Sequence, residues 1–121
     1  MPTIQPQPLR DFGYALFEAA GVPVDQAHVA TDHLVESNLM GHDSHGMLHA
    51  AGYIRGLQSG AIQPVGNQKI IRETPVSAVI DANRSFGIVL TYEAMRMAVA
   101  KAKEHTLGAV AVHRSSHIGR L

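Results

Sequence analysis

Apolar positions follow a helical period over residues 1–60 and a strand-like period beyond them. The helical spacing predicts three helices, each ended by a glycine: they span 8–20, 25–40 and 44–58. QKIIRE and VSAVIDA, with Pro75 between them, are short and β-rich, and they predict two strands joined by a tight connection. The stretch 88–105 predicts a long fourth helix, and LGAVAVHR predicts a fully apolar third strand that we expect to be buried.

This order of elements, with helices first and then a hairpin, a helix and a strand, predicts a mixed α/β fold. Residues 1–60 form the expected N-terminal helical region, and 61–121 form the expected first part of an α/β domain. A hairpin plus one strand is a thin sheet for so many helices, so we expect this domain to be incomplete. Phe12 and Asn38 belong to the expected buried helix faces, and Asp25 is the expected N-cap of the second helix.

Charge and composition narrow the classes of partner and compartment. The chain has 10 Lys plus Arg and 10 Asp plus Glu, so it lacks the basic excess of a nucleic-acid-binding protein. No apolar run is long enough to cross a bilayer, and the start MPTIQPQPLR lacks the pattern of a signal peptide. Without cysteine, the chain can form neither disulfides nor a thiolate zinc site. We expect a cytoplasmic protein that binds neither nucleic acid nor membrane.

Histidine is the unusual residue, because three of the eight histidines fall in GHDSHGMLH, residues 41–49. His42, His45 and His49 are spaced three and four apart, so on a continuous helix they would share one face and could bind zinc with an open fourth position. Gly41 argues against this arrangement, since it should break the helix just before His42. A three-histidine metal site is one alternative for this segment.

Two further interpretations concern Ser44 and His45. Ser44 is a weak candidate for a nucleophile, because neighbouring side chains on a helix point about 100° apart and His45 could not serve as its base. His45 is a better candidate for a proton donor, because backbone N–H groups at the first turn of a helix disfavour a second proton on the ring. On the plainest interpretation, Asp43 or Ser44 caps the next helix and the segment is only a polar turn.

A second polar segment, HRSSHIGRL at residues 113–121, follows the predicted third strand. Ligands of α/β proteins gather at the carboxyl ends of strands, and a loop with Ser115, Ser116 and Gly119 could cradle a phosphate. No G-x-G-x-x-G fingerprint occurs in the chain, so an ordinary Rossmann dinucleotide site is not predicted. An exposed polar loop is the competing interpretation. The DANRSF turn at 81–86 is interpreted as structural.

Three motifs, in this order and at this spacing, carry a resemblance to a known family: GHDSHG before a helix with Tyr53, D-x-N-x-x-x-G before the alanine-rich helix, and SSHIGRL after an apolar strand. The chain resembles the malate/lactate/sulfolactate dehydrogenase family, most of all its bacterial hydroxycarboxylate dehydrogenase branch. The resemblance implies a non-Rossmann α/β fold, NAD or NADP as cofactor, a homodimer, and interconversion of small 2-oxo and 2-hydroxy acids. Residues 61–121 would then begin the cofactor-binding domain.

The resemblance also implies roles for single residues. Ser44 matches the serine of a catalytic relay pair, and His45 matches a proton donor that also lies against the nicotinamide cofactor. His117 matches a histidine that some members use as the acid/base. A cofactor-contacting loop is matched by the residues at the end of the chain: His117, Ile118, Gly119, Arg120 and Leu121.

Two departures from the family pattern bear on the site. Many members carry an arginine four residues after the proton-donor histidine, where it grips the substrate carboxylate, and here that position is His49. A protonated His49 would hold the carboxylate more weakly, and Arg55 lies further along the same helix. The chain is also much shorter than members of the family. Its partner would be the missing C-terminal part of the same protein, or the chain would be a truncated module without catalytic activity.

Overall fold

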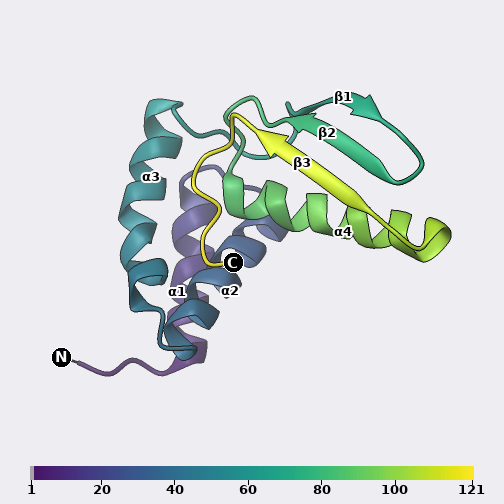
Figure 1. Cartoon of the computed structure of the whole chain (residues 1–121). Helices are drawn as coiled ribbons and strands as arrows, with labels where there is room; N and C mark the ends of the chain where they lie inside the picture. Colours follow the sequence, from purple (N-terminus) through teal and green to yellow (C-terminus); the bar gives the residue numbers. More distant parts are fainter. Residues whose placement is uncertain (1) are drawn as a thin grey trace. The chain divides into compact units, whose positions relative to one another are not determined.

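The computed structural model describes residues 2–121 and divides them into two compact units. The first unit comprises residues 2–64 with Gly119–Leu121, and the second comprises Val65–Ile118. The helices of the first unit are α1 (Pro6–Ala19), α2 (Val24–Leu39) and α3 (Ala50–Ser59). The second unit contains β1 (Lys69–Glu73), β2 (Ser77–Asp81), α4 (Gly87–His105) and β3 (Ala109–His113). The predicted mixed α/β fold is confirmed (Figure 1). Within residues 2–121, no helix has the length and apolar character that crossing a membrane requires.

α1 and α2 pack against each other through small and apolar side chains. Phe17 on α1 and Leu34 on α2 are fully buried, and each such side chain stabilises the fold by about 2 kcal/mol. Gly13 lets the helices approach closely, because a methyl group there would overlap the Thr31 side chain. The predicted buried face of α1 is wrong at Phe12, whose side chain is 60% exposed.

The connection between α1 and α2 differs from the prediction at the start of α2. Asp25 is not the N-cap, because α2 begins at Val24 and Pro23 occupies the cap position. Asp25 lies instead in the first turn, where a carboxylate suits the positive end of the helix dipole. Gly21 takes a φ of 91°, a left-handed conformation that glycine adopts without strain, and it ends α1 as predicted.

Polar side chains join the exposed sides of α1 and α2. Tyr14 Oη donates to Asp32 Oδ1 at 2.5 Å, and Arg10 Nε pairs with the same oxygen at 3.3 Å. The Tyr14 ring also stacks on His28, with the ring centroids 3.8 Å apart. The hydrogen bond to Asp32 raises the pKa of Tyr14 to about 12, so the phenol keeps its proton at neutral pH.

The second unit is a three-stranded sheet with α4 along one face (Figure 1). β1 and β2 form an antiparallel hairpin, and β3 pairs with β2 in parallel, which gives the order β1-β2-β3. α4 is the helical crossover that a parallel pair of consecutive strands requires. The core of this unit consists of apolar side chains from the strands and the helix: Ile80, Ala82, Leu90 and Ala94, with Val65, Met97, Val110 and Val112 packed around them.

β3 corrects one expectation, because its side chains alternate in exposure and are not buried throughout. Val110 and Val112 pack against the core, whereas Ala109 and Ala111 are exposed. β3 lies at an edge of the sheet, and alternation with a period of two is typical of a strand with one covered face.

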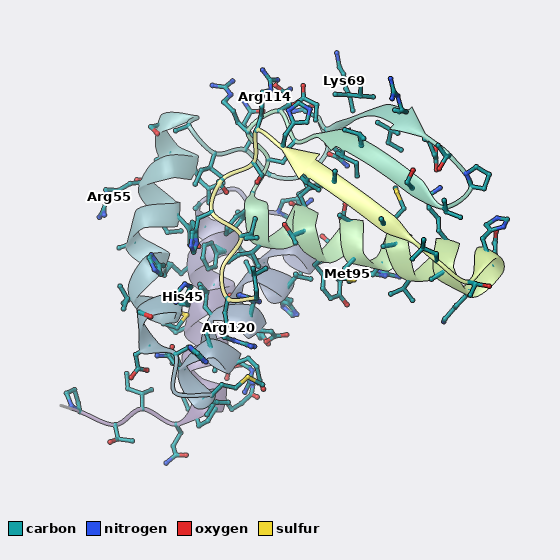
Figure 2. The ribbon with its side chains drawn as sticks, viewed as in Figure 1. His45, Arg55, Lys69, Met95, Arg114 and Arg120 are labelled. Atoms are coloured by element: carbon teal, nitrogen blue, oxygen red, sulfur yellow. The ribbon has the colours of Figure 1, made fainter. Side chains whose placement is uncertain are left out.

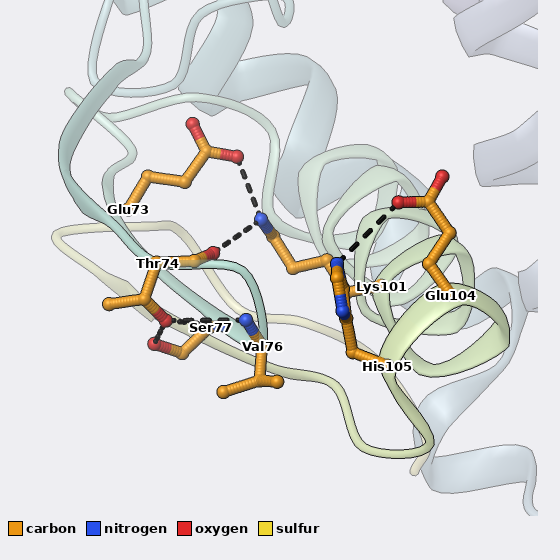
Figure 3. A network of polar contacts seen from close by, with 7 residues as sticks. All are labelled: Glu73, Thr74, Val76, Ser77, Lys101, Glu104 and His105. Carbon is orange, nitrogen blue, oxygen red and sulfur yellow. Dashed lines mark hydrogen bonds and ion pairs between the residues drawn. The ribbon is translucent and has the colours of Figure 1, made fainter.

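Polar contacts connect the hairpin turn with the C-terminal half of α4 (Figure 3). Lys101 Nζ donates to Glu73 Oε1 and to the Thr74 carbonyl oxygen, both at 2.8 Å. Within the turn, the Thr74 hydroxyl oxygen accepts from the N–H of Ser77 at 3.0 Å. The Lys101 side chain is only 13% exposed, so its ion pair is better shielded than most surface pairs.

Candidate active site

GHDSHG forms two tight turns that connect α2 with α3. Gly41, with a φ of 79°, ends the α2 helix in a left-handed conformation. Two 3₁₀ turns follow, Asp43–His45 and Met47–His49, and Gly46 between them is extended. α3 begins only at Ala50. The catalytic candidates of this segment therefore lie on a structured connection and not on a helix.

This local structure overturns two expectations. The helix predicted from Ser44 does not form there, and neither Asp43 nor Ser44 is the N-cap of a helix. The extended backbone of Gly46 is the reason, because it interrupts the run of helical dihedrals. His45 therefore precedes the first turn of α3, and the predicted placement of its ring at the start of that helix is wrong.

Asn38, near the end of α2, holds the two turns together. Its Nδ2 donates to Asp43 Oδ1 at 2.6 Å, and its Oδ1 accepts from the N–H of Met47 at 2.9 Å. A methyl group on Gly46 would overlap the Asn38 amide, so the chain passes close to it. The helical pattern predicts Asn38 only as part of a buried face. The sequence feature that could have indicated this role is the amide itself, because an amide on a partly buried helix face needs hydrogen-bond partners.

Ser44, His45 and His49 are linked to one another. Ser44 Oγ lies 3.0 Å from His45 Nδ1, and the Nε2–H of His49 donates to the Ser44 carbonyl oxygen at 2.7 Å. The rings of His45 and His49 meet edge to face, with centroids 6.3 Å apart. The expectation that the adjacent Ser44 and His45 cannot face each other is wrong, because their side chains lie within hydrogen-bond distance on this 3₁₀ turn.

Tyr53 on α3 extends this row of side chains. Its ring centroid lies 6.0 Å from that of His49, and its side chain is 5% exposed. Burial raises the pKa of Tyr53, so the phenol is neutral. His45 (Figure 2) and His49 are half-buried and Ser44 is exposed, so the row is sheltered at Tyr53 and accessible at Ser44.

The three-histidine metal alternative finds no assembled site. Within residues 2–121, no group of three His, Cys, Asp or Glu side chains is arranged to hold a metal ion. His49 directs Nε2 to the Ser44 carbonyl oxygen, and His42 is exposed and precedes the first 3₁₀ turn. The spacing of three and four places His42, His45 and His49 on one face only if the helix is continuous, and it is not.

The second polar segment, after β3, is held by residues far away in the sequence. Ser116 Oγ accepts from the N–H of Gly87, the first residue of α4, at 2.7 Å. A methyl group on Gly87 would overlap the backbone carbonyl groups of Ser116 and His117, so this approach requires glycine. Ser116 therefore holds the start of α4. His117 is exposed and belongs to the second unit, whereas Ser44, His45 and His49 belong to the first.

The DANRSF turn is anchored to the end of β3, as its structural interpretation predicts. Arg114 Nε donates to Asp81 Oδ1 at 2.8 Å, and the N–H of Asn83 donates to the same oxygen at 2.9 Å. These two bonds hold the pKa of Asp81 below its usual range. Asn83, Arg84 and Arg114 take positive φ angles of 48°, 65° and 57°, so the ends of β2 and β3 meet in a strained conformation.

The last residues, Gly119–Leu121, belong to the first unit. The backbone N–H of Arg120 donates to His33 Nε2 on α2 at 2.9 Å. The Nε of Arg120 (Figure 2) is shielded from solvent and has no hydrogen-bond partner within residues 2–121. Sequence reasoning missed His33, because its partner lies 87 residues further along the chain and no local spacing indicates the contact.

The fold and this site define a class of α/β protein in which a Ser–His pair follows two helices and a glycine–arginine segment follows a parallel strand. The sequence model of the malate/L-lactate dehydrogenase family matches residues 4–121. The chain belongs to this family, as its motifs predict.

Similar proteins include hydroxycarboxylate dehydrogenases and malate dehydrogenases. Hydroxycarboxylate dehydrogenase B of Escherichia coli O157:H7 is 39% identical over 115 residues, which cover 95% of this chain and 32% of that protein. A malate dehydrogenase of Pyrococcus abyssi is 39% identical over 99 residues, covering 82% and 27% of the two chains. The solved malate dehydrogenase of Pyrococcus horikoshii OT3 matches with a TM-score of 0.94 at 32% identity, covering 98% and 34%. The chain spans about a third of the length of these relatives.

Proposed function

We propose that the chain is the N-terminal part of an NAD(P)-dependent dehydrogenase that interconverts small 2-oxo and 2-hydroxy acids. Family membership supports this reaction class, because the similar proteins are named hydroxycarboxylate, malate and sulfolactate dehydrogenases. The Ser44–His45 pair carries the proposal, since it is a hydrogen-bonded acid/base group on a turn that Asn38 holds. Reduction of a ketone needs a positioned proton donor at the oxygen that becomes the hydroxyl group.

In the reducing direction, His45 gives the proton and Ser44 determines which ring nitrogen gives it. When both ring nitrogens carry a proton, Nδ1–H donates to Ser44 Oγ, and Nε2–H protonates the oxygen at C2 of the oxo acid. NADH or NADPH supplies the hydride that C2 accepts. The His45 ring is then neutral. It keeps the proton on Nδ1, which still donates to Ser44 Oγ. In the oxidising direction, Nε2 takes the proton of the hydroxyl group.

His49 is the proposed binding residue for the substrate carboxylate. Its Nε2–H is engaged by the Ser44 carbonyl oxygen, so Nδ1, when protonated, is the atom that would bind the carboxylate. The same bond braces the backbone of the proton-donor pair. Arg55, exposed on α3, is a second cation further along the chain (Figure 2).

The residues after β3 fit the anionic part of a nicotinamide dinucleotide. Arg120 Nε is a shielded donor with no hydrogen-bond partner within residues 2–121, and a phosphate oxygen would satisfy a group that is costly to bury unpaired. We assign His117, Ile118, Gly119 and Leu121 to the same cofactor loop, His117 also as a second acid/base group. Residues 1–60 are the proposed N-terminal helical region, and 61–121 begin the proposed cofactor-binding domain.

The proposed protein is a cytoplasmic homodimer in which the longer C-terminal part found in the relatives completes the site. The family resemblance supports the dimer, and the lack of cysteine agrees with a reducing compartment. The cofactor is NAD or NADP, and the substrate is a small 2-oxo or 2-hydroxy acid.

The substitution His45→Ala, made in the full-length gene product, tests this function. Turnover of 2-oxo acids with NADH or NADPH should fall by about two to four orders of magnitude, the usual contribution of a general acid. His42→Ala is the matched control, because His42 is an exposed histidine of the same connection that lies outside the pair, and it should keep its turnover. An unchanged kcat in His45→Ala would remove His45 from the mechanism. A folded wild-type protein that binds neither NADH nor NADPH would favour the non-catalytic module.

A further inference from the structure

The contact between His33 and Arg120 fixes the state of the His33 ring. A backbone N–H can only donate, so His33 Nε2 must accept and carries no proton. The ring in this contact is therefore the neutral form with its proton on Nδ1. His33 is half-buried near the middle of α2, so its ring supports the loop from within a regular helix.

Gly119 fits closely against the same ring. Its φ is 80°, which favours glycine, and a methyl group added there would overlap the His33 imidazole. Gly119 is buried, whereas the neighbouring Leu121 is 93% exposed. The segment is thus held at two consecutive residues, by ring packing at Gly119 and by a hydrogen bond at Arg120.

We propose that His33 is a positioning residue for the cofactor loop. His33 holds Gly119 and the backbone of Arg120, and so it fixes the position from which the Arg120 side chain extends. The shielded Nε of Arg120 is thereby directed toward a phosphate group of NADH or NADPH. This inference rests on the proposed function, which assigns the loop to the cofactor. His33 itself touches neither substrate nor cofactor in this role.

The kinetic test compares His33→Leu with His33→Gln in the protein as its gene encodes it. Leucine removes the acceptor, and the KM and Kd for NADH or NADPH should rise about tenfold, the effect of one lost hydrogen bond of about 1.4 kcal/mol, while kcat stays close to wild type. Glutamine offers Oε1 at similar reach and should restore most of the affinity. His28→Leu, an exposed histidine on the same helix, is the control and should bind the cofactor like wild type.

A second variant covers the case in which His33→Leu fails to fold. Gly119→Ala leaves α2 unchanged but drives the loop away from the ring, so it should raise the Kd for the cofactor by a similar factor. Wild-type affinity in either folded variant would overturn the proposal.

A measurement without cofactor separates this inference from the proposed function. In nitrogen-15 NMR spectra, His33 Nε2 should show the shift of an unprotonated, hydrogen-bonded nitrogen, and the Arg120 amide should exchange slowly with solvent. A protonated Nε2 or a rapidly exchanging amide would overturn the contact itself. If the contact is present but the wild-type protein binds neither NADH nor NADPH, the proposed function fails and the role of His33 in cofactor binding falls with it.

Discussion

Two connections carry the candidate chemistry, and they are built in opposite ways. The first, Gly41–His49, is held by hydrogen bonds whose side-chain partners lie one, five, five and nine residues apart. The second, Arg114–Leu121, is held by bonds that span 29, 33 and 87 residues. The first connection is determined by its own neighbourhood, whereas the second takes its shape only once distant elements have folded.

This difference predicts whether a substitution changes mainly the local chemistry or mainly the stability of the fold. A local turn loses little chain entropy when it forms, so its residues can be changed with mainly local and chemical consequences. A connection held by distant partners couples its geometry to the stability of the whole unit. Three substitutions test this contrast.

Gly87→Ala should have the largest effect and should act on stability. The added methyl group meets backbone carbonyl groups of Ser116 and His117, which cannot rotate away, so we expect a loss of about 3 kcal/mol in the free energy of unfolding. Urea unfolding monitored by circular dichroism measures it. Gly52→Ala is the matched control, because Gly52 lies in α3 with nothing near its missing Cβ, and it should gain about 0.5–1 kcal/mol. Equal midpoints for both variants would contradict the long-range character of the second connection.

Asn38→Leu should have a smaller effect, confined to the first connection. It leaves the N–H of Met47 without its acceptor, which costs about 2 kcal/mol in the free energy of unfolding. Turnover should fall as well, since the Ser44–His45 pair loses its support. Gln58→Leu, at an exposed amide on α3, should stay within about 0.5 kcal/mol of wild type. If Asn38→Leu kept both wild-type stability and wild-type turnover, the bridge between the two turns would have no function.

His49→Gln should have the smallest effect and should separate two roles within the first connection. The glutamine amide can still donate to the Ser44 carbonyl oxygen but carries no charge. We therefore expect the KM for the oxo acid to rise about tenfold with kcat nearly unchanged. His49→Ala, which removes the brace as well, should also lower kcat. An unchanged KM in His49→Gln would assign the carboxylate to another group, such as Arg55.

The sequence predicts the elements well where their signal is periodic and local. The helices at α1, α2 and α4, the hairpin and the third strand all follow from spacing, and the motif around Ser44 and His45 predicts the candidate site. The helix predicted over 44–58 is wrong at its start, because the spacing of apolar residues carries no information about the extended backbone of Gly46. Asp25 fails as a cap for a related reason, since Pro23 already fixes the chain direction one residue before the helix.

Other residues were beyond local patterns for a physical reason. Asn38 acts through two partners on a following turn, and His33 acts through a residue that only tertiary folding brings near it. Neither has a period or a motif of its own. Phe12 shows the converse, because it has the right spacing for a core position and yet faces solvent.

The order of the two units along the chain has a consequence for biosynthesis. Val65–Ile118 is inserted between the two pieces of the first unit, so a ribosome delivers α1, α2 and α3 well before Gly119–Leu121. The contact between His33 and Arg120 can form only after the whole inserted unit has been synthesised. Closing a flexible loop of 87 residues costs roughly 4 kcal/mol of chain entropy, so this contact should form late, after α2 and the inserted sheet. The newly made helical region is therefore complete only after the whole inserted unit has been synthesised.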